Sequence, residues 1–215
     1  MIRAIYFIAE GATEVEFIEN CLRRYFADRG IYDIRGFDMG GSNSYDRYKY
    51  DVITFLNKEH DIIVTSLIDY YRLPNNFPGY SESHRLNGNE QKVAFIEEQI
   101  SENINNSRFV PYIQLHEFEA LLFTDIKGFS DIPGCDKKIV AELKSIIDQY
   151  PNPELINDGA NTAPSKRLKI IEGYKKPLYG AYIALDNGLE SIINKCPRFK
   201  AWLDKLEAKV ASQGY

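Results

Sequence analysis

Short apolar runs alternate with helix-type patterns along the first half of the chain. The runs typical of strands span residues 5–9, 31–39, 61–69 and 109–115. Between them, apolar residues recur at positions i, i+3 and i+4, which is the period of a helix with one buried face. The run at 61–69 is the most nearly continuous, as expected for a central parallel strand that is buried on both faces. This order predicts alternating strands and helices around a mostly parallel, four-stranded sheet.

The opening stretch of the chain reads as a strand, a tight turn and a helix. Glu10 follows the first apolar run directly, and Gly11 allows a sharp turn and the close approach of a ligand. We expect Thr13 to cap the helix that follows, with Glu16 completing a capping box. Ligands of open α/β sheets bind at the carboxyl ends of the strands, so this turn is a candidate site. An ordinary βα turn with solvated glutamates has the same pattern.

Two features refine the prediction for the first half. Residues 70–88 contain prolines and glycines but no periodicity, which predicts a long loop of the kind that is either functional or disordered. Pro111 indicates that the fourth strand begins late or lies at an edge of the sheet, because proline cannot donate a ladder hydrogen bond.

The second half of the chain carries a helical pattern throughout. Apolar residues keep the helical period across 139–147 and 199–210, and Pro164 stands at a first-turn position of a further helix. We therefore predict an α/β core in residues 1–124. The helical C-terminal region, residues 125–215, is expected to cap the same body.

Composition sets limits on the class of protein. The chain has 215 residues, of which 44% are hydrophobic and 27% charged, as in soluble globular proteins. Its net charge of −5 argues against a broadly basic surface, but leaves room for a local basic groove that binds nucleic acid. Three cysteines, odd in number and far apart, suit reduced thiols in a cytoplasmic protein. No signal peptide is visible, and no apolar stretch approaches the ~20 residues that cross a bilayer, so we expect no membrane partner.

Acidic residues stand at the ends of three predicted strands. Glu10, Asp69 and Glu117 each follow an apolar run, and parallel strands would gather these ends at one edge of the sheet. Carboxylates within a few Å of one another repel unless a cation is present, and sets of oxygen ligands suit Mg²⁺ or Mn²⁺. The pattern predicts a divalent-metal site that acts on a phosphate ester. In the alternative interpretation each acid only stabilises a helix N-terminus, by ~0.3–1 kcal/mol.

Basic residues gather in a later segment. Ser165, Lys166 and Arg167 stand at a predicted helix N-terminus, with further lysines at positions 169, 175 and 176. Such a helix start is a good phosphate cradle, although a solvated helix face has the same composition. Arg72 lies near a strand end, where it would meet a nucleic-acid backbone. His116 either orients a carboxylate or a water, or is a hydrogen-bonded structural residue.

The segment Ala9–Glu14 and the acid at position 69 resemble the Toprim fold. This fold is shared by topoisomerases, primases and the nucleases of the overcoming-lysogenization-defect (OLD) type. The string Glu-Gly-x-Thr-Glu at 10–14 is the form typical of the OLD-like branch, where both glutamates are implicated in metal binding. The resemblance implies that Glu10 is a general acid or base or a metal ligand, and that Glu14 and Asp69 bind Mg²⁺.

Longer strings resemble an uncharacterised bacterial family, known as domain-of-unknown-function family 4276. They span residues 69–74, 111–123 and 162–168, and the likeness extends over most of the chain. Members of this family are similar to Toprim proteins. Some are encoded beside AAA-type ATPases in what look like anti-phage loci.

The chain departs from the Toprim pattern at one acidic position. The Toprim Asp-x-Asp is here Asp69-Tyr70-Tyr71, and a tyrosine hydroxyl with a pKa of ~10 is a poor ligand for Mg²⁺. Glu117 or Glu119 would have to complete the metal shell. Two residues apart, they share a face on an extended chain and diverge on a helix.

Two classes of function follow from these residues. The first is a Mg²⁺-dependent phosphodiester hydrolase, a Toprim-like nuclease that is the effector of an ATPase-linked anti-phage system. Here Lys166 and Arg167 would stabilise charge on the phosphate. Substrate-binding positions would be Gly11, Thr13, Arg72, His116, Ser165, Lys166 and Arg167. The second class is a non-catalytic sensor or docking subunit for an AAA-type ATPase.

Some questions stay open at this stage. No Gly-x-x-x-x-Gly-Lys-Ser/Thr motif occurs, so ATP hydrolysis would have to come from a partner. A small-nucleotide phosphatase or nucleotidyl-transfer enzyme would use the same acids. The sequence is compatible with a homo-oligomer and does not distinguish DNA from RNA as substrate.

Overall fold

The centre of the protein is a parallel β-sheet, as the sequence predicts. The computed structural model describes residues 2–40, 44–156, 159 and 161–212. The strands are β1 (Ala4–Ala9), β2 (Asp33–Asp38), β3 (Ile62–Asp69), β4 (Phe109–Val110) and β5 (Ile113–Gln114). The sheet order is β2-β1-β3-β4, and β5 pairs with the carboxyl end of β3. All of these pairings are parallel.

Helices connect the strands and then form most of the second half of the chain. The α-helices are α1 (Ala12–Phe17), α2 (Arg23–Ala27), α3 (Tyr45–Lys58), α4 (Tyr80–Ser83), α5 (Asn89–Ile104), α6 (Lys137–Gln149), α7 (Pro164–Arg167), α8 (Lys176–Asn187), α9 (Leu189–Lys195) and α10 (Pro197–Ser212). A π-helical segment, η1 (Ile18–Leu22), joins α1 to α2. The 3-10 helices are η2 (Phe118–Thr124), η3 (Lys127–Phe129), η4 (Pro153–Leu155) and η5 (Leu168–Ile170). None of the described helices combines the length and apolar character needed to cross a lipid bilayer.

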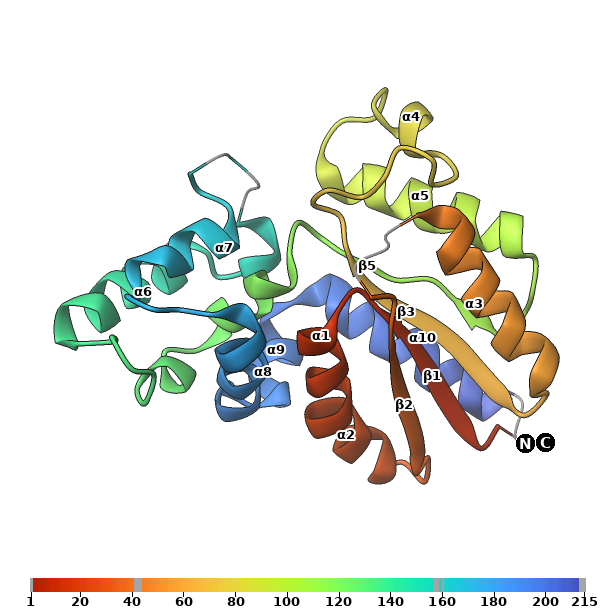
Figure 1. Cartoon of the computed structure of the whole chain (residues 1–215), viewed down its shortest axis with the longest axis horizontal. Coiled ribbons are helices and arrows are strands. Elements are labelled where there is room, and N and C mark those ends of the chain that lie inside the picture. The colour runs from red at the N-terminus through yellow and green to blue at the C-terminus, as the bar shows by residue number, and fades with distance from the viewer. Residues whose placement is uncertain (1, 41–43, 157–158, 160, 213–215) are drawn as a thin grey trace.

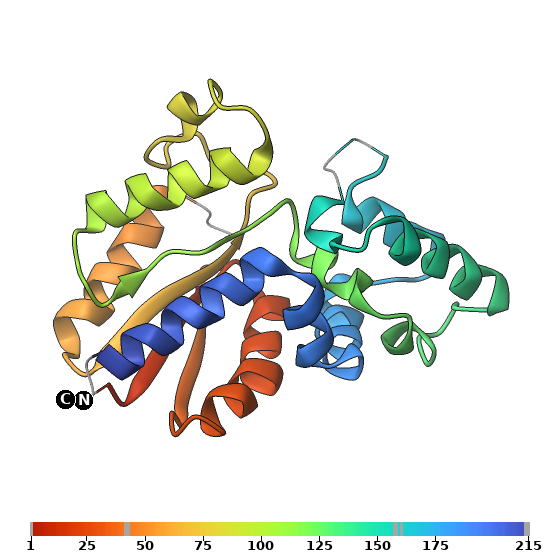
Figure 2. The same cartoon turned by 180° about the vertical axis from the view of Figure 1, so that it is seen from behind.

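The sheet separates two hydrophobic cores. Side chains alternate along β1, so Ile5 and Phe7 enter one core while Tyr6 and Ile8 enter the other. Helices α1, α2 and α10 cover the first face, and α3 and α5 cover the second (Figures 1 and 2). Every residue of β3 is buried, which confirms it as the central strand.

Helices α6 to α9 lie together beside the end of the sheet at which β1 and β3 finish (Figure 1). The chain then returns to the sheet as α10, whose N-terminus is held by Glu154. The carboxylate of this buried residue accepts hydrogen bonds from the backbone N–H groups of Arg198 at 2.9 Å and Phe199 at 3.1 Å. Helix α10 contributes Phe199, Trp202 and Leu203 to the core on one face of the sheet. The division of the chain into two regions on one body stays a prediction. The boundary at residue 124 stays a prediction.

Two local predictions are wrong for physical reasons. Thr13 does not cap α1, because the N-cap position is Gly11, with no side-chain hydrogen bond, and Thr13 is a buried residue of the first helical turn. The predicted strand 109–115 is broken into β4 and β5, since Pro111 lies between them and has no N–H to donate. Its expected place at the sheet edge is correct for β4.

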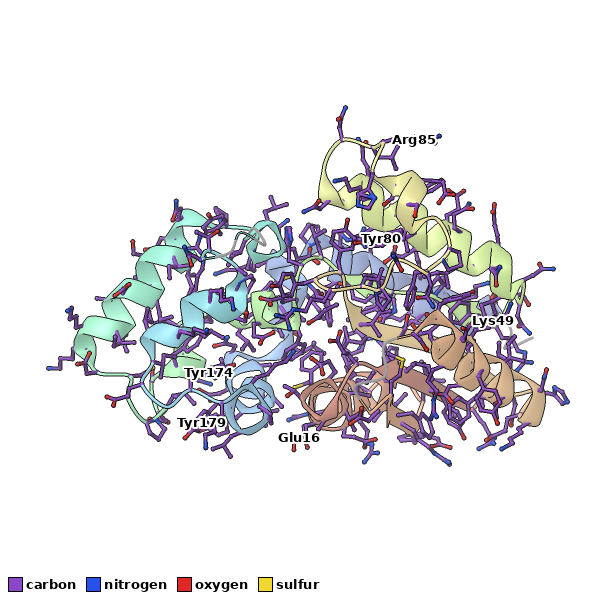
Figure 3. The ribbon with its side chains drawn as sticks, turned by 45° about the horizontal axis from the view of Figure 1, so that its top comes forward. Glu16, Lys49, Tyr80, Arg85, Tyr174 and Tyr179 are labelled. Atoms are coloured by element: carbon purple, nitrogen blue, oxygen red, sulfur yellow. The ribbon has the colours of Figure 1, made fainter. Side chains whose placement is uncertain are left out.

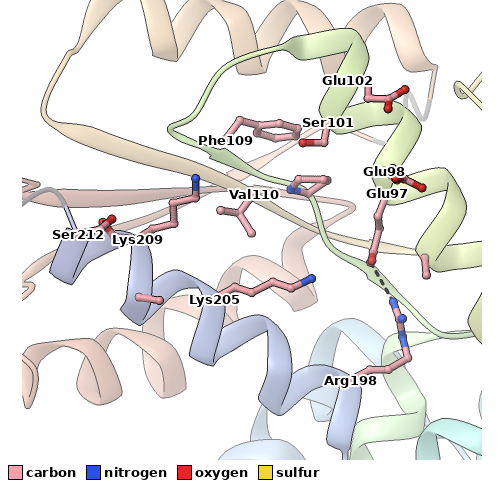
Figure 4. Close-up of a pocket in the computed structure, with 13 residues that line it drawn as sticks. Glu97, Glu98, Ser101, Glu102, Phe109, Val110, Arg198, Lys205, Lys209 and Ser212 are labelled. Atoms are coloured by element: carbon pink, nitrogen blue, oxygen red, sulfur yellow. Dashed lines mark hydrogen bonds and ion pairs between the residues drawn. The ribbon is translucent and has the colours of Figure 1, made fainter.

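A groove of about 910 Å³ follows this edge of the sheet, between α5 and α10 (Figure 4). Glu97, Glu98 and Glu102 line one wall, while Arg198, Lys205 and Lys209 line the other. An ion pair of 2.9 Å between Arg198 and Glu97 bridges the two walls. The acids at the strand ends do not line this groove, so the chemistry expected from the sequence lies elsewhere.

Candidate acidic site at the carboxyl edge of the sheet

Glu10 and Asp69 lie side by side at the carboxyl edge of the sheet. The register of the parallel strands β1 and β3 pairs Ala9 with Leu67, so the residues that follow emerge together. The backbone N–H of Asp69 donates a hydrogen bond of 2.9 Å to Oε2 of Glu10. The structure thus brings these two acids into one place, as the strand pattern requires.

The ammonium group of Lys176 contacts three carboxylates, one of which belongs to Asp69. Its Nζ is 2.8 Å from Oε1 of Glu14, 3.2 Å from Oε2 of Glu119 and 3.7 Å from Oδ2 of Asp69. The four residues come from α8, α1, η2 and β3. All three acidic side chains are buried, while the lysine side chain is 28% exposed. One ammonium group therefore forms ion pairs with three of the acids that the sequence predicts to be metal ligands.

Glu117 has a different partner from Glu119. Its two carboxylate oxygens accept hydrogen bonds of 2.8 Å from the backbone N–H and the hydroxyl of Ser165. Glu117 is the residue before η2, and Glu119 lies in its first turn, so their side chains diverge as a helical start requires. The acidic strand end thereby joins α7 through one glutamate and α8 through the other.

Burial and mutual repulsion dominate the electrostatics. Burial raises the pKa of Asp69 well above its ordinary value, the ammonium of Lys176 opposes the shift, and the neighbouring carboxylates of Glu10, Glu14 and Glu119 reinforce it. Burial also raises the pKa of Glu119. Burial alone would lower the pKa of Lys176, but Asp69, Glu119 and Glu14 raise it well above its ordinary value. The site therefore stabilises a positive charge and disfavours a further negative one.

Tyr174 borders this site on its helical side. Burial and then the charge of Glu119 raise the pKa of its phenol. Its ring lies 6.2 Å from that of Tyr179, and both are labelled in Figure 3. The hydroxyl of Tyr174 is buried and has no hydrogen-bond partner within the described part of the chain.

The predicted phosphate cradle has its own partners. The guanidinium of Arg167 donates to the carbonyl of Thr162 at 2.8 Å and to the hydroxyl of Tyr150 at 3.1 Å. These contacts tie Arg167 to the helical region. Neighbouring Lys166 is partly buried in α7. Ser165 is the cradle residue that contacts one of the acids, so the role of the two basic residues on phosphate stays a prediction.

The remaining predicted positions surround the acids in different ways. Gly11 lies close to Glu14, since a Cβ built on it would be 3.5 Å from Oε2. His116 is buried, with a left-handed φ of 67°, and its carbonyl accepts a hydrogen bond of 2.7 Å from the N–H of Tyr71. Arg72 is exposed, also left-handed, and its guanidinium lies 5.2 Å from the ring centre of Tyr71. Arg72 therefore faces solvent, three residues after Asp69 in the chain.

Sequence reasoning assigned no role in the acidic site to Lys176 or Gly180. The Lys176-Pro177 pair does signal a helix start, because proline is favoured in the first turn. No spacing rule connects that start to the ends of β1 and β3, which lie more than a hundred residues earlier in the chain. Gly180 lies one turn after Lys176, where helix α8 approaches α1.

We expect Gly180→Ala to destabilise the protein. In most helix interiors this change stabilises by up to about 1 kcal/mol. Here the added Cβ would lie 2.8 Å from Cγ2 of buried Thr13, and overpacking of this kind costs about 1–3 kcal/mol. Urea unfolding should therefore show a lower free energy of unfolding. Thr13→Ser removes the clashing methyl group, so the same glycine substitution made in a Thr13→Ser background should be neutral or stabilising. A stabilising effect in the wild-type background would contradict close packing of α8 on α1.

Among the described residues, no group of three or more His, Cys, Asp or Glu side chains is arranged to hold a metal ion. The reason is visible in the contacts of the acids. Glu14, Asp69 and Glu119 converge on the ammonium of Lys176, and Glu117 is taken by Ser165. Carboxylate oxygens nevertheless are the donors that Mg²⁺ and Mn²⁺ prefer.

Solved structures share this arrangement of sheet and helices. The C-terminal region of the Xanthomonas campestris pv. campestris OLD protein is 14% identical with a TM-score of 0.52, covering 100% of this chain and 99% of its own. For the C-terminal region of the Burkholderia pseudomallei OLD protein the values are 15%, 0.54, 98% and 97%. At this level of identity the likeness concerns the fold. The chain thus has an α/β fold like that of these OLD C-terminal regions, as its opening motif predicts.

Sequence comparison gives the family. The profile described as "Domain of unknown function (DUF4276)" matches residues 9–207, and the chain belongs to this family. The family resemblance and the resemblance in fold to OLD-type proteins, both found in the sequence, are therefore confirmed. A search of curated proteins finds no match.

Proposed function

We propose that this protein is a divalent-metal-dependent phosphodiester hydrolase that acts on nucleic acid. The observation that carries the proposal is the convergence of buried carboxylates and one ammonium group where β1 and β3 end. Oε2 of Glu10 accepts a 2.9 Å hydrogen bond from the backbone N–H of Asp69, and the Asp69 carboxylate lies 3.7 Å from Nζ of Lys176. Because carboxylates outnumber the ammonium here, a divalent ion held by these acids would supply the positive charge that the binding and hydrolysis of a phosphate ester need.

Each of these residues has a role in hydrolysis. Glu10 is partly exposed at the rim and would accept the proton of the attacking water. The ammonium of Lys176 would bind a non-bridging phosphate oxygen and stabilise the charge that develops on it. The buried carboxylates hold that ammonium in place. Arg72, exposed beside the site, would contact the neighbouring phosphates of a polymer.

One divalent ion fits this donor set. The Glu10 carboxylate lies against the backbone of Asp69, whose N–H it accepts at 2.9 Å. The two carboxylates would hold Mg²⁺ or Mn²⁺, leaving the remaining positions to water and phosphate. When bound, the ion would act as a Lewis acid on the phosphate and lower the pKa of a bound water.

A cleavage assay tests this function. The purified chain is incubated with DNA, RNA and tRNA in Mg²⁺, in Mn²⁺ or in chelator, and compared with Glu10→Gln. We expect metal-dependent cleavage by the wild type. The cleavage rate of the variant, which lacks the proton acceptor, should be lower by a factor of at least about 10². Glu16→Gln, a change of the same charge on the exposed side of α1, is the matched control and should cleave normally. Equal cleavage by wild type and Glu10→Gln would contradict the assignment.

A second candidate function is a non-catalytic docking subunit for an AAA-type ATPase. One observation favours it: three of the six strongly exposed large apolar side chains in the described part of the chain lie on α8, namely Leu178, Tyr182 and Leu185. Their spacing places them on one helical face. Binding of an ATPase encoded beside this chain, lost when the three are changed to serine, together with no cleavage under any metal condition, would favour this role over the first.

A further inference from the structure

The charges around Lys176 do not balance. Three carboxylates, those of Glu14, Asp69 and Glu119, face one ammonium group at 2.8 to 3.7 Å. Taking charges out of water costs several kcal/mol per ion unless partners compensate them, so one cation here is essential. When these three acids and the adjoining Glu10 are ionised, the cluster keeps three negative charges, and one divalent ion would leave one.

The ammonium is held in this position by its helix. Lys176 is the first residue of α8, and Gly180 lets that helix contact α1 at the level of Thr13. The Nζ atom also lies 5.5 Å from the ring centre of Phe118, the residue whose N–H donates to Oδ1 of Asp69 at 2.8 Å. Packing on two sides therefore fixes the charge where it is.

The ammonium of Lys176 also offers a reason for the absence of an acidic residue at position 71. Two residues after Asp69 the chain carries Tyr71 rather than a carboxylate. A site that already contains a covalently attached cation needs fewer anionic ligands, because one of its positive charges is permanent. The loss of an acid at position 71 and the presence of an ammonium at position 176 thus change the charge of the site in the same direction.

We propose that Lys176 is a resident cation that takes the place of a second metal ion, so that the site accepts no more than one divalent ion. The proposal rests on the proposed function for the identity of the site, and it concerns ion stoichiometry rather than cleavage. In the folded protein, Glu14 and Glu119 contact the ammonium, and Asp69, which also faces it, would hold the ion together with Glu10.

Mn²⁺ binding to the metal-free chain tests the proposal. Titration calorimetry, with free Mn²⁺ followed by electron paramagnetic resonance, should give at most one ion for the wild type. Lys176→Met keeps the length of the side chain and removes its charge, and should bind one ion more. Lys176→Arg keeps the charge and should behave as the wild type. Lys175→Met, a loss of the same charge one residue earlier on an exposed side chain, is the matched control.

Thermal unfolding gives a second measurement. Lys176→Met leaves the buried carboxylates without their partner, so its melting temperature should fall in metal-free buffer. Mn²⁺ should then raise it by more than it raises that of the wild type. This comparison also covers a variant that folds only when the metal is present. A variant that Mn²⁺ does not restore, an unchanged stoichiometry in Lys176→Met, or two ions in the wild type would each overturn the proposal.

These outcomes are separate from the failure of the proposed function. An additional Mn²⁺ ion in Lys176→Met, with no cleavage by the wild type, would support Lys176 as a resident cation and contradict the proposed hydrolase activity. Cleavage that depends on Glu10, with no additional ion in Lys176→Met, would support the proposed hydrolase activity and contradict the role of Lys176 as a resident cation.

Discussion

Asp69→Asn should lower the rate of phosphodiester cleavage by about 10²–10³-fold while the protein stays folded. Asparagine keeps the shape of the side chain and the oxygen that accepts the N–H of Phe118. It removes the charge that would bind the metal ion and that faces Lys176 at 3.7 Å. The substitution therefore removes the chemistry and leaves the packing intact. Initial rates at saturating Mg²⁺ would measure the loss.

The stability of this variant is part of the same expectation. Because burial raises the pKa of Asp69, its ionised form costs folding free energy, and an uncharged side chain avoids this cost. Urea unfolding at neutral pH should give an unchanged or higher free energy of unfolding. Asp61→Asn, the same substitution just before the amino end of β3, is the matched control and should cleave at the wild-type rate. Normal cleavage by Asp69→Asn would exclude the carboxylate from the reaction, and unfolding would assign it a structural role.

The pairing of Glu10 with Asp69 was predictable because it depends on chain-local features. Continuous apolar runs identify β1 and β3, and helical patterns between them impose a parallel pairing. Parallel strands necessarily finish at the same edge of the sheet. An acid directly after each run must then lie at that edge, whatever the details of packing.

Lys176 was not predictable in the same way, because its place depends on how α8 packs against α1. Hydrophobic period identifies a helix and its buried face but gives no partner for that face. The contact between Ser165 and Glu117 joins residues 48 positions apart and has the same origin. Metal-ligand reasoning from sequence treats every gathered carboxylate as available, since it has no means of placing an internal counter-ion.

Packing also overrides the local rule at Thr13. Its spacing from Glu16 satisfies the capping-box pattern, yet α1 begins earlier and the threonine faces Gly180 of α8. A capping box contributes about 1 kcal/mol, which is less than a buried helix contact can contribute. Local patterns of this size are reliable only where no tertiary contact competes with them.

Trp202→Ala should be the most destabilising single substitution considered for this chain, at about 3–5 kcal/mol. The side chain is 2% exposed and lies in the core between α10 and the sheet. Its ring stacks on Tyr112 at 4.3 Å and meets Phe7 edge-on at 5.8 Å, and its Nε1–H donates to the hydroxyl of Thr65 at 2.8 Å. Truncation would leave a cavity and remove the donor of a buried hydrogen bond. The free energy of unfolding of a domain is only about 5–15 kcal/mol, so this substitution would remove a large part of it.

The measurement is urea unfolding followed by far-ultraviolet circular dichroism, because Trp202 is the single tryptophan of the chain and its removal abolishes tryptophan fluorescence. Trp202→Phe retains an aromatic ring but no donor, so it should lose about 1–3 kcal/mol. Tyr50→Ala truncates an aromatic side chain that is 66% exposed and should stay within about 0.5 kcal/mol of the wild type. If Trp202→Ala unfolds at nearly the wild-type urea concentration, α10 is not part of the cooperative core. The two faces of the sheet would then differ in how firmly their helices are held.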